Sequence, residues 1–170
     1  MTSSWTPRRF GGQVAVRAVL MRGGTSKGLF FHDVDLPGAG AERDHLLVRA
    51  LGSPHALQLD GLGGGTSSTS KIMVVHRPTS EGEIAYEFGQ VSLDSAQVDW
   101  SGNCGNLTTA VAAFCIDEGL VPPTEPEATV RLRNAATGVA VEAHIEVAGG
   151  ASRVVGEFGT PGVPFSGSPI

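Results

Sequence analysis

The chain has 170 residues, including 24 glycines, 10 prolines and 2 cysteines, and its formal net charge is −5 at pH 7. This length fits one domain with a buried core, and the acidic balance argues against a nucleic-acid binder. The sequence shows no apolar stretch long enough to span a membrane, no secretory signal and too few cysteines for a disulfide framework. We therefore expect a cytoplasmic protein with free thiols and no membrane partner.

The predicted elements are short, and turns rich in glycine and proline separate them. Residues 1–12 are expected to be a loose leader, and the domain is expected to run from residue 13 to residue 170. Alternating apolar residues, or a high content of β-branched and aromatic residues, predict strands. The predicted strands are residues 14–20, 71–76, 84–92, 129–133 and 139–147, the last two joined as a hairpin by residues 134–138.

Two helices are predicted, and they differ in how much of their surface is apolar. Residues 41–51 carry leucines and alanine on one side and end before Gly52 and Pro54, which is typical of an amphipathic helix. Residues 107–116 are apolar on nearly every face, which predicts a buried helix. Many short strands around one very apolar helix predict a mixed α+β domain whose sheet wraps that helix.

The segment before the buried helix is the first candidate site. Residues 101–106 read Ser-Gly-Asn-Cys-Gly-Asn, and such small, turn-forming residues let the backbone approach a ligand closely. Cys104 is expected at or just before the first helical turn, where free N–H groups and the helix dipole favour a thiolate or a bound carboxylate. Cys104 is therefore a candidate reactive thiol, whereas Cys115 is expected to be a buried core residue.

A glycine- and hydroxyl-rich loop, residues 60–71, is the second candidate site. Its N–H and O–H donors suit carboxylate or phosphate oxygens, but its glycine spacing matches neither a Walker A loop nor a dinucleotide-binding fingerprint. Lys71 ends this loop and could act as a base; the alternative is a solvated lysine beside a flexible surface loop. Two such loops in one short chain, each ending in a reactive side chain, favour the functional interpretation.

Other polar and aromatic residues carry weaker signals. Arg22 and Lys27, in a glycine-rich turn, either bind substrate carboxylates or are solvated turn residues, and the sequence favours neither. The five histidines share no metal-ligand spacing with the cysteines, so no metal site is expected. Phe88 and Trp100 are expected in the core.

Several motifs together resemble the PrpF family, the 2-methylaconitate cis-trans isomerases of the methylcitrate cycle of propionate catabolism. They are residues 22–28, 65–71, 88–92 and 98–108, and the resemblance runs from about residue 16 to residue 158. It implies a diaminopimelate-epimerase-like fold with two similar domains, each a mixed β-barrel wrapped around a central helix, and an active site between them. It also implies that residues 13–170 are the N-terminal domain, that the second domain is absent from this chain, and that the fragment alone is inactive.

The resemblance further implies catalysis without a cofactor, with Lys71 and Cys104 as the catalytic residues. Such an enzyme removes a proton from a small unsaturated tricarboxylate and returns one, through an enolate-like intermediate. We take Lys71 as the base and Cys104 as the proton donor, although the reverse order stays open. The residues expected to bind substrate or stabilise the intermediate are Arg22, Thr25, Ser26, Ser67, Ser68, Thr69, Ser70, Asn103, Gly105 and Asn106.

Other functions stay open from the sequence. One is a 4-oxalomesaconate tautomerase or a racemase on the same fold, and another is a non-catalytic accessory partner of an aconitase-like enzyme. A Cys104 thiol that is slow to alkylate would favour the accessory partner. The uncovered contact surface of a missing domain would favour self-association, for example as a homodimer.

Overall fold

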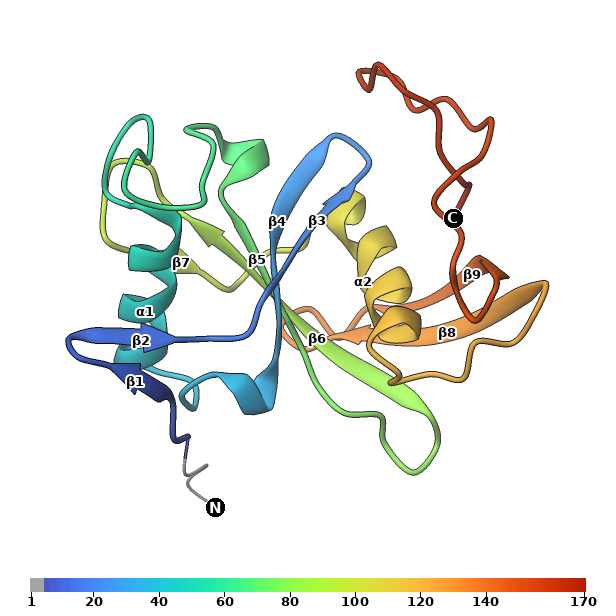
Figure 1. The fold of residues 1–170 in the computed structure, drawn as a ribbon, viewed down its shortest axis with the longest axis horizontal. Coiled ribbons are helices and arrows are strands. Elements are labelled where there is room, and N and C mark those ends of the chain that lie inside the picture. The colour runs from blue at the N-terminus through green and yellow to red at the C-terminus, as the bar shows by residue number, and fades with distance from the viewer. Residues whose placement is uncertain (1–4) are drawn as a thin grey trace.

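The structure of this chain is one large curled β-sheet with two α-helices, and the computed structural model describes residues 5–170 (Figure 1). The first four residues of the expected leader therefore lie outside the described residues. The helices are α1 (Ala41–Leu51) and α2 (Gly105–Asp117), and two short 3-10 turns are η1 (Asp33–Asp35) and η2 (Ser67–Thr69). The strands are β1 (Arg8–Phe10), β2 (Gln13–Ala15), β3 (Val19–Gly23), β4 (Ser26–His32), β5 (Lys71–Val75), β6 (Glu83–Val91), β7 (Val98–Asp99), β8 (Glu127–Asn134), β9 (Ala140–Ala148) and β10 (Ala151–Ser152).

The main sheet is mixed and curls around α2. Its strands lie in the order β10-β9-β8-β6-β5-β4-β3, and β7 pairs with the end of β6. Neighbouring strands are antiparallel except for two parallel pairs, β4 with β5 and β6 with β8. Because α2 contacts strands from both ends of this order, β3 as well as β9 and β10, the sheet forms a barrel-like wall around it (Figure 1). This arrangement confirms the predicted α+β fold, a mixed sheet wrapped around one central helix.

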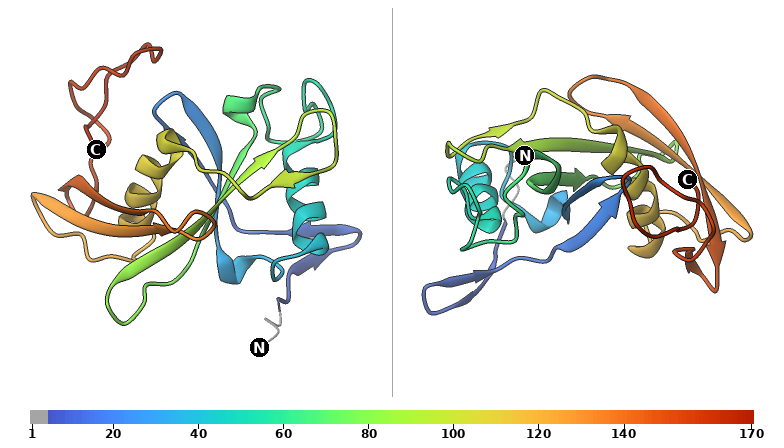
Figure 2. Two further views of the ribbon diagram at one scale, coloured as in Figure 1. Left: turned by 180° about the vertical axis from the view of Figure 1, so that it is seen from behind. Right: turned by 90° about the horizontal axis from the view of Figure 1, so that it is seen from above.

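Alternate residues of the central strands face two apolar cores on opposite sides of the sheet. In β4, Phe30 packs in the core around α2, whereas Leu29 and Phe31 pack in the core against α1. In β5, Met73 and Ile72 divide between the same two cores. The helices accordingly lie on opposite sides of these strands (Figure 2). Since both faces are covered, β4 and β5 read as nearly continuous apolar runs instead of alternating ones.

The burial of α2 on nearly every side confirms its role as the central helix. Its residues Leu107, Val111 and Cys115 are fully enclosed. Burial raises the pKa of the Cys115 thiol to about 12, which agrees with the predicted core role of this cysteine. The helix starts after Cys104 and ends before Gly119, whose φ of 72° is in the left-handed region and lets its N–H reach the Ile116 carbonyl.

The structure departs from the sequence prediction near the N-terminus. Strand β1 and strand β2 form a separate hairpin, so residues 8–10 of the expected loose leader are a strand. The one strand expected over residues 14–20 is two strands, because Val14 pairs with Arg9 in the hairpin whereas Val19 pairs with Phe30 in the main sheet. Apolar residues alternate on both sides of this break, so periodicity alone did not reveal it.

The other predicted elements are confirmed, with ends that move by at most two residues. The β8–β9 hairpin pairs Val130 with Ala143, and its loop is residues 135–139, one residue later than the expected 134–138. Phe88 lies in the core around α2, and Trp100 packs against the core beneath α1, as predicted. Within residues 5–170, neither helix is long and apolar enough to cross a membrane.

Candidate active site

The N-terminal end of α2 packs closely against the turn between β3 and β4. Asn106 donates a hydrogen bond from Nδ2 to Thr25 Oγ1, at 2.9 Å. A Cβ atom at Gly23 would lie 2.1 Å from the Asn106 carbonyl oxygen, and one at Gly24 would lie 2.5 Å from Asn106 Oδ1. Only glycine allows this approach, which explains the glycine pair in the turn.

Gly23→Ala is expected to destabilise the protein by about 1–3 kcal/mol, because the added methyl group overlaps backbone that cannot move freely. Gly105→Ala is the matched control: it lies in the first turn of α2, and nothing lies within 4 Å of its Cβ position. We expect the control to change the free energy of unfolding by no more than about 0.5 kcal/mol. Urea denaturation of both variants measures the difference, and equal destabilisation would contradict this packing.

Cys104 occupies the N-cap position of α2, as predicted. Its backbone is extended, with φ of −128°, and its side chain is free of a capping hydrogen bond. The Sγ atom lies 3.7 Å from Ser26 Oγ, and Ser26 itself is buried at the start of β4. Gly105 and Asn106 are the first two residues of the helix, so their N–H groups have no partner within it. The thiol is thus partly buried beside a hydroxyl and two free backbone donors.

Ser26→Ala is expected to slow alkylation of Cys104 by iodoacetamide at pH 7. The Ser26 hydroxyl can donate to the thiolate, and losing a hydrogen bond worth about 0.5–1.5 kcal/mol corresponds to roughly a two- to ten-fold lower rate. Mass spectrometry of the alkylated peptide gives that rate. Buried Cys115 is the internal control, since it should react only when the protein unfolds. An unchanged Cys104 rate would show that the Ser26 hydroxyl does not stabilise the thiolate.

Lys71 is the first residue of β5 and is 9% exposed. Its Nζ atom donates to Gln90 Oε1 at 2.6 Å and lies 5.1 Å from the centre of the Phe88 ring. It is therefore a buried lysine held in place, which disagrees with the alternative of a solvated side chain. Within residues 5–170, no carboxylate lies within ion-pair distance of Nζ, so its polar partner is a neutral amide.

Lys71 and Cys104 lie on the same face of the sheet. Lys71 and Met73 are two residues apart in β5, so their side chains point to the same face of the sheet, the face toward α2. On β4, Gly28 pairs with Lys71, and two residues earlier on the same face Ser26 contacts Cys104. A Cβ at Gly28 would lie 2.6 Å from the Lys71 carbonyl and 3.0 Å from Leu107 Cδ1, so strand and helix are in close contact there. The fold thus brings Lys71, the last residue of one candidate loop, and Cys104, in the other, to the side of the sheet that α2 covers.

The hydroxyl-rich loop is ordered by hydrogen bonds within itself. Ser70 is buried, and its hydroxyl is within hydrogen-bonding distance of Gln58 Oε1 and of the Thr66 carbonyl, at 2.7 Å each. Thr66 and Thr69 cap the 3-10 turn η2 reciprocally. Ser68 Oγ lies 3.0 Å from Thr66 Oγ1, whereas Ser67 is exposed. Of the expected substrate-binding hydroxyls, those of Ser68, Thr69 and Ser70 thus already have partners inside the loop.

Two further candidate residues, Asn103 and Arg22, have different surroundings. Asn103 Oδ1 accepts hydrogen bonds from Tyr86 Oη, at 3.1 Å, and from Asn134 Nδ2, also at 3.1 Å. Asn103 and Gly105 also line a cavity of about 440 Å³ between α2 and β9. Arg22 is exposed and donates to the Gly24 carbonyl of its own turn, which agrees with the turn role among its two alternatives.

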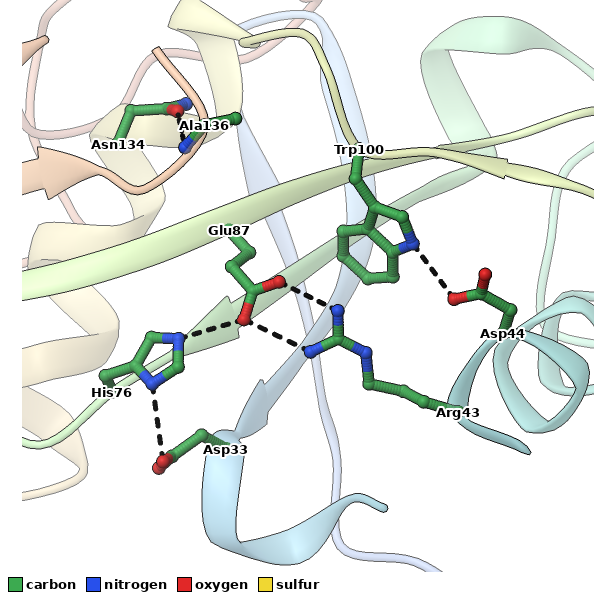
Figure 3. Close-up of polar contacts among 8 residues, drawn as sticks. All are labelled: Asp33, Arg43, Asp44, His76, Glu87, Trp100, Asn134 and Ala136. Carbon is green, nitrogen blue, oxygen red and sulfur yellow. Dashed lines mark hydrogen bonds and ion pairs between the residues drawn. The ribbon is translucent and has the colours of Figure 1, made fainter. Parts of the chain in front are cut away.

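A partly buried polar network on the α1 side anchors the segment that leads to Cys104 (Figure 3). Arg43 donates two hydrogen bonds to the Glu87 carboxylate, at 2.8 and 3.1 Å, and its guanidinium lies 4.3 Å from the centre of the Trp100 ring. Trp100 Nε1 donates to Asp44 at 2.9 Å. Since Trp100 directly precedes residues 101–106, the network fixes where this segment begins.

The charges of this network shift two pKa values in opposite directions. Burial alone would raise the pKa of Glu87, but hydrogen bonds and charge from His76 and Arg43 outweigh it and lower this pKa to about 2. The hydrogen bond with Glu87 raises the pKa of His76 against the opposing effect of burial, and Asp33 adds to the rise. Both shifts favour the charged forms of Glu87 and His76.

Two glutamines that organise the site were missed by the sequence analysis. Gln58 is 1% exposed, and its side chain links Ser53, the Gly65 N–H and Ser70. Gln90 contacts Lys71. Gln90 lies inside a motif that carried the family resemblance, so its position was the available signal; nothing in the local pattern marks Gln58. Within the described part of the chain, no three His, Cys, Asp or Glu side chains group to hold a metal ion.

Comparison with known proteins identifies the relatives of the chain. A family model described as PrpF protein matches residues 13–170. The 2-methyl-aconitate isomerase of Shewanella oneidensis is 47% identical over 169 residues, which cover 93% of this chain and 43% of that protein. The 4-oxalomesaconate tautomerase of Pseudomonas putida is 39% identical over 154 residues, covering 90% of this chain and 43% of that protein.

Among solved structures, a methylitaconate-delta-isomerase matches with a TM-score of 0.87 and 40% identity, covering 90% of this chain and 40% of that one. A hydroxyproline epimerase matches with a TM-score of 0.50 and 18% identity, covering 80% of this chain and 39% of that one, which shows a shared fold alone. The chain spans less than half the length of the relatives it matches.

Proposed function

The chain belongs to the PrpF protein family, and on this premise we propose that it carries the acid–base residues of an isomerase of small unsaturated tricarboxylates. The preferred substrate is 2-methylaconitate, and the proposed role is in the methylcitrate cycle of propionate catabolism in the cytoplasm. One observation carries the proposal: a buried lysine with a neutral partner and a thiol at a helix N-terminus lie on one face of the sheet.

The proposed mechanism is a proton transfer with no change in oxidation state. The Lys71 amine takes a proton from the carbon next to the substrate double bond, and the electron pair spreads onto a conjugated carboxylate. The free N–H groups of Gly105 and Asn106, together with the positive end of the α2 dipole, stabilise this charge. Cys104 then delivers a proton to carbon. If the proton returns to the original carbon after rotation about the former double bond, the product is a geometric isomer. If the proton is delivered to the far carbon of the delocalised system, the double bond has moved by an allylic shift.

We also propose that residues 13–170 form the N-terminal domain of a two-domain enzyme whose cleft is closed by a second, similar domain. The greater length of the relatives supports this arrangement. The proposed consequence is that the present 170 residues alone have little or no turnover, because one wall of the cleft and its carboxylate-binding groups are then missing. Adding the partner domain should restore activity.

A substrate panel tests the proposed function. The two-domain protein is incubated separately with 2-methylaconitate, 3-methylitaconate and 4-oxalomesaconate, and conversion is followed by proton NMR. We expect the highest kcat/KM with 2-methylaconitate. Preference for 4-oxalomesaconate, the substrate class named in the Pseudomonas putida relative, would move the assignment to a tautomerase. No turnover of any of the three would overturn the proposal and favour a non-catalytic accessory protein.

A further inference from the structure

We propose that Gln90 is a positioning residue that orients the Lys71 amine for proton transfer. The inference rests on the proposed function, since it assigns Gln90 a role through Lys71. Gln90 lies near the end of β6 and pairs with Lys71 of β5 in the register of the sheet. Its Oε1 atom accepts a hydrogen bond from Lys71 Nζ at 2.6 Å.

The orientation of the Gln90 amide is fixed by its other contacts. Its Nε2 atom donates to the carbonyl oxygens of Ser70, at 2.9 Å, and Ser67, at 3.2 Å, and lies 3.4 Å from the carbonyl oxygen of Val91. Carbonyl oxygens accept hydrogen bonds and cannot donate them, so the NH₂ end must face them and Oε1 must face Nζ. The loop backbone therefore fixes the acceptor that holds Lys71.

The chemistry of this partner suits a lysine that must exchange protons. A carboxylate beside Nζ would hold the amine in its charged form, whereas a neutral amide oxygen accepts from the ammonium and from the neutral amine alike. The Phe88 ring, 5.1 Å from Nζ, limits the amine on another side. Glu87 is on the opposite face of β6, where it binds Arg43 of α1. On the α2 side, the titratable groups near the start of this helix include Cys104, Tyr86, and Glu142 and His144 of β9. Gln90 thus directs the amine without fixing its charge.

Two substitutions separate positioning from simple support of the loop. Gln90→Met removes the acceptor, and we expect kcat to fall about 10- to 100-fold with KM changed less than about two-fold, as for a misplaced catalytic group. Gln90→Glu places a carboxylate beside Nζ and favours the protonated amine, so we expect the acid limb of the kcat–pH profile, where the base must lose its proton, to move to higher pH. Gln97→Ala is the matched control, because Gln97 is an exposed glutamine in the loop after β6. It should leave kcat and the profile unchanged.

Chemical labelling gives a readout that does not depend on turnover. The chain has only two lysines, Lys27 and Lys71, so acylation measured by mass spectrometry at a series of pH values resolves both. In Gln90→Glu the pH of half-maximal Lys71 labelling should rise, while Lys27 labelling stays unchanged. A Gln90 that only supported the loop would lower the urea midpoint without moving this pH.

The outcomes distinguish this inference from the proposed function. If Lys71→Met is inactive while both Gln90 variants keep the wild-type kcat, pH profile and labelling, the positioning role of Gln90 is wrong and the proposed function stands. If Lys71→Met keeps full activity, the proposed function fails. If the labelling pH shifts in Gln90→Glu while both Gln90 variants keep the wild-type kcat and pH profile, the two residues are in contact but the positioning role of Gln90 is wrong. Circular dichroism of each variant shows that it is folded.

Discussion

Replacing Lys71 with methionine is expected to lower the kcat of the two-domain protein by about 10²- to 10⁴-fold, the usual contribution of a general acid or base. Methionine keeps most of the side-chain length and packs against Phe88, so the fold should persist. The Gln90 amide oxygen loses its partner, which we expect to cost about 1–3 kcal/mol of stability. Steady-state turnover measures the first effect and urea denaturation the second.

The two cysteines provide a paired test of the second catalytic group. Cys104→Ala should lower kcat by a similar factor, because the proton donor at the start of α2 is removed. Cys115→Ala should keep kcat near the wild-type value while lowering stability, since Cys115 is fully enclosed in the core. Wild-type turnover by Lys71→Met or Cys104→Ala would contradict the assignment of that residue.

The Arg43–Glu87–His76 network is expected to give the protein its greatest stability between about pH 4.5 and 6.5. Folding lowers the Glu87 pKa from an ordinary 4.5 to about 2, so this stabilisation is full above pH 4.5 and is lost as the pH falls toward 2. It amounts to about 3 kcal/mol at 1.36 kcal/mol per pKa unit. The His76 pKa is raised above 6.5, so its contribution is full below that pH and is lost as the pH rises through the folded-state value.

Glu87→Gln tests this pH dependence directly. The free energy of unfolding, measured by urea denaturation from pH 3 to pH 9, should lose most of its acid-side slope in this variant. Glu83→Gln is the control, because the Glu83–Arg133 ion pair is exposed. Removing this pair should change the acid-side slope far less than Glu87→Gln does. If the free energy of unfolding falls equally at acid pH in the wild type and in Glu87→Gln, the network does not determine the acid stability of the fold.

The parts of the fold that could be predicted are those with a strong local signal. Residues 41–51 have an apolar side and a glycine–proline stop, and α1 has the predicted ends. The position of α1 opposite α2 could not be predicted, because β4 and β5 are apolar on both faces and periodicity does not say which helix covers which face. The β1–β2 hairpin was missed because β1 reads Arg-Arg-Phe, is exposed and shows no alternating apolar pattern.

The catalytic candidates were predictable because glycines and hydroxyls surround them. Lys71 and Cys104 each follow or lie within a small-residue segment, and the structure brings both to one face of the sheet. Gln58 and Gln90 were missed because their roles depend on residues that are distant in the sequence. Gln90 bonds to Ser70, 20 residues away, and Gln58 bonds to Ser70, 12 residues away. The partly buried Glu87 was also missed, because an acidic residue in a strand resembles a solvated one until its partner on α1 is known.

Solvent deuterium incorporation tests the central claim most directly. The two-domain protein and its Lys71→Met and Cys104→Ala variants are incubated with 2-methylaconitate in D₂O, and the carbon-bound deuterium of the recovered isomers is followed by NMR. The account predicts that deuterium enters the isomers with the wild-type protein and that the rate of entry falls at least about 100-fold in both variants. Isomerisation with no deuterium at carbon, or with undiminished deuterium entry in both variants, would contradict proton transfer through Lys71 and Cys104.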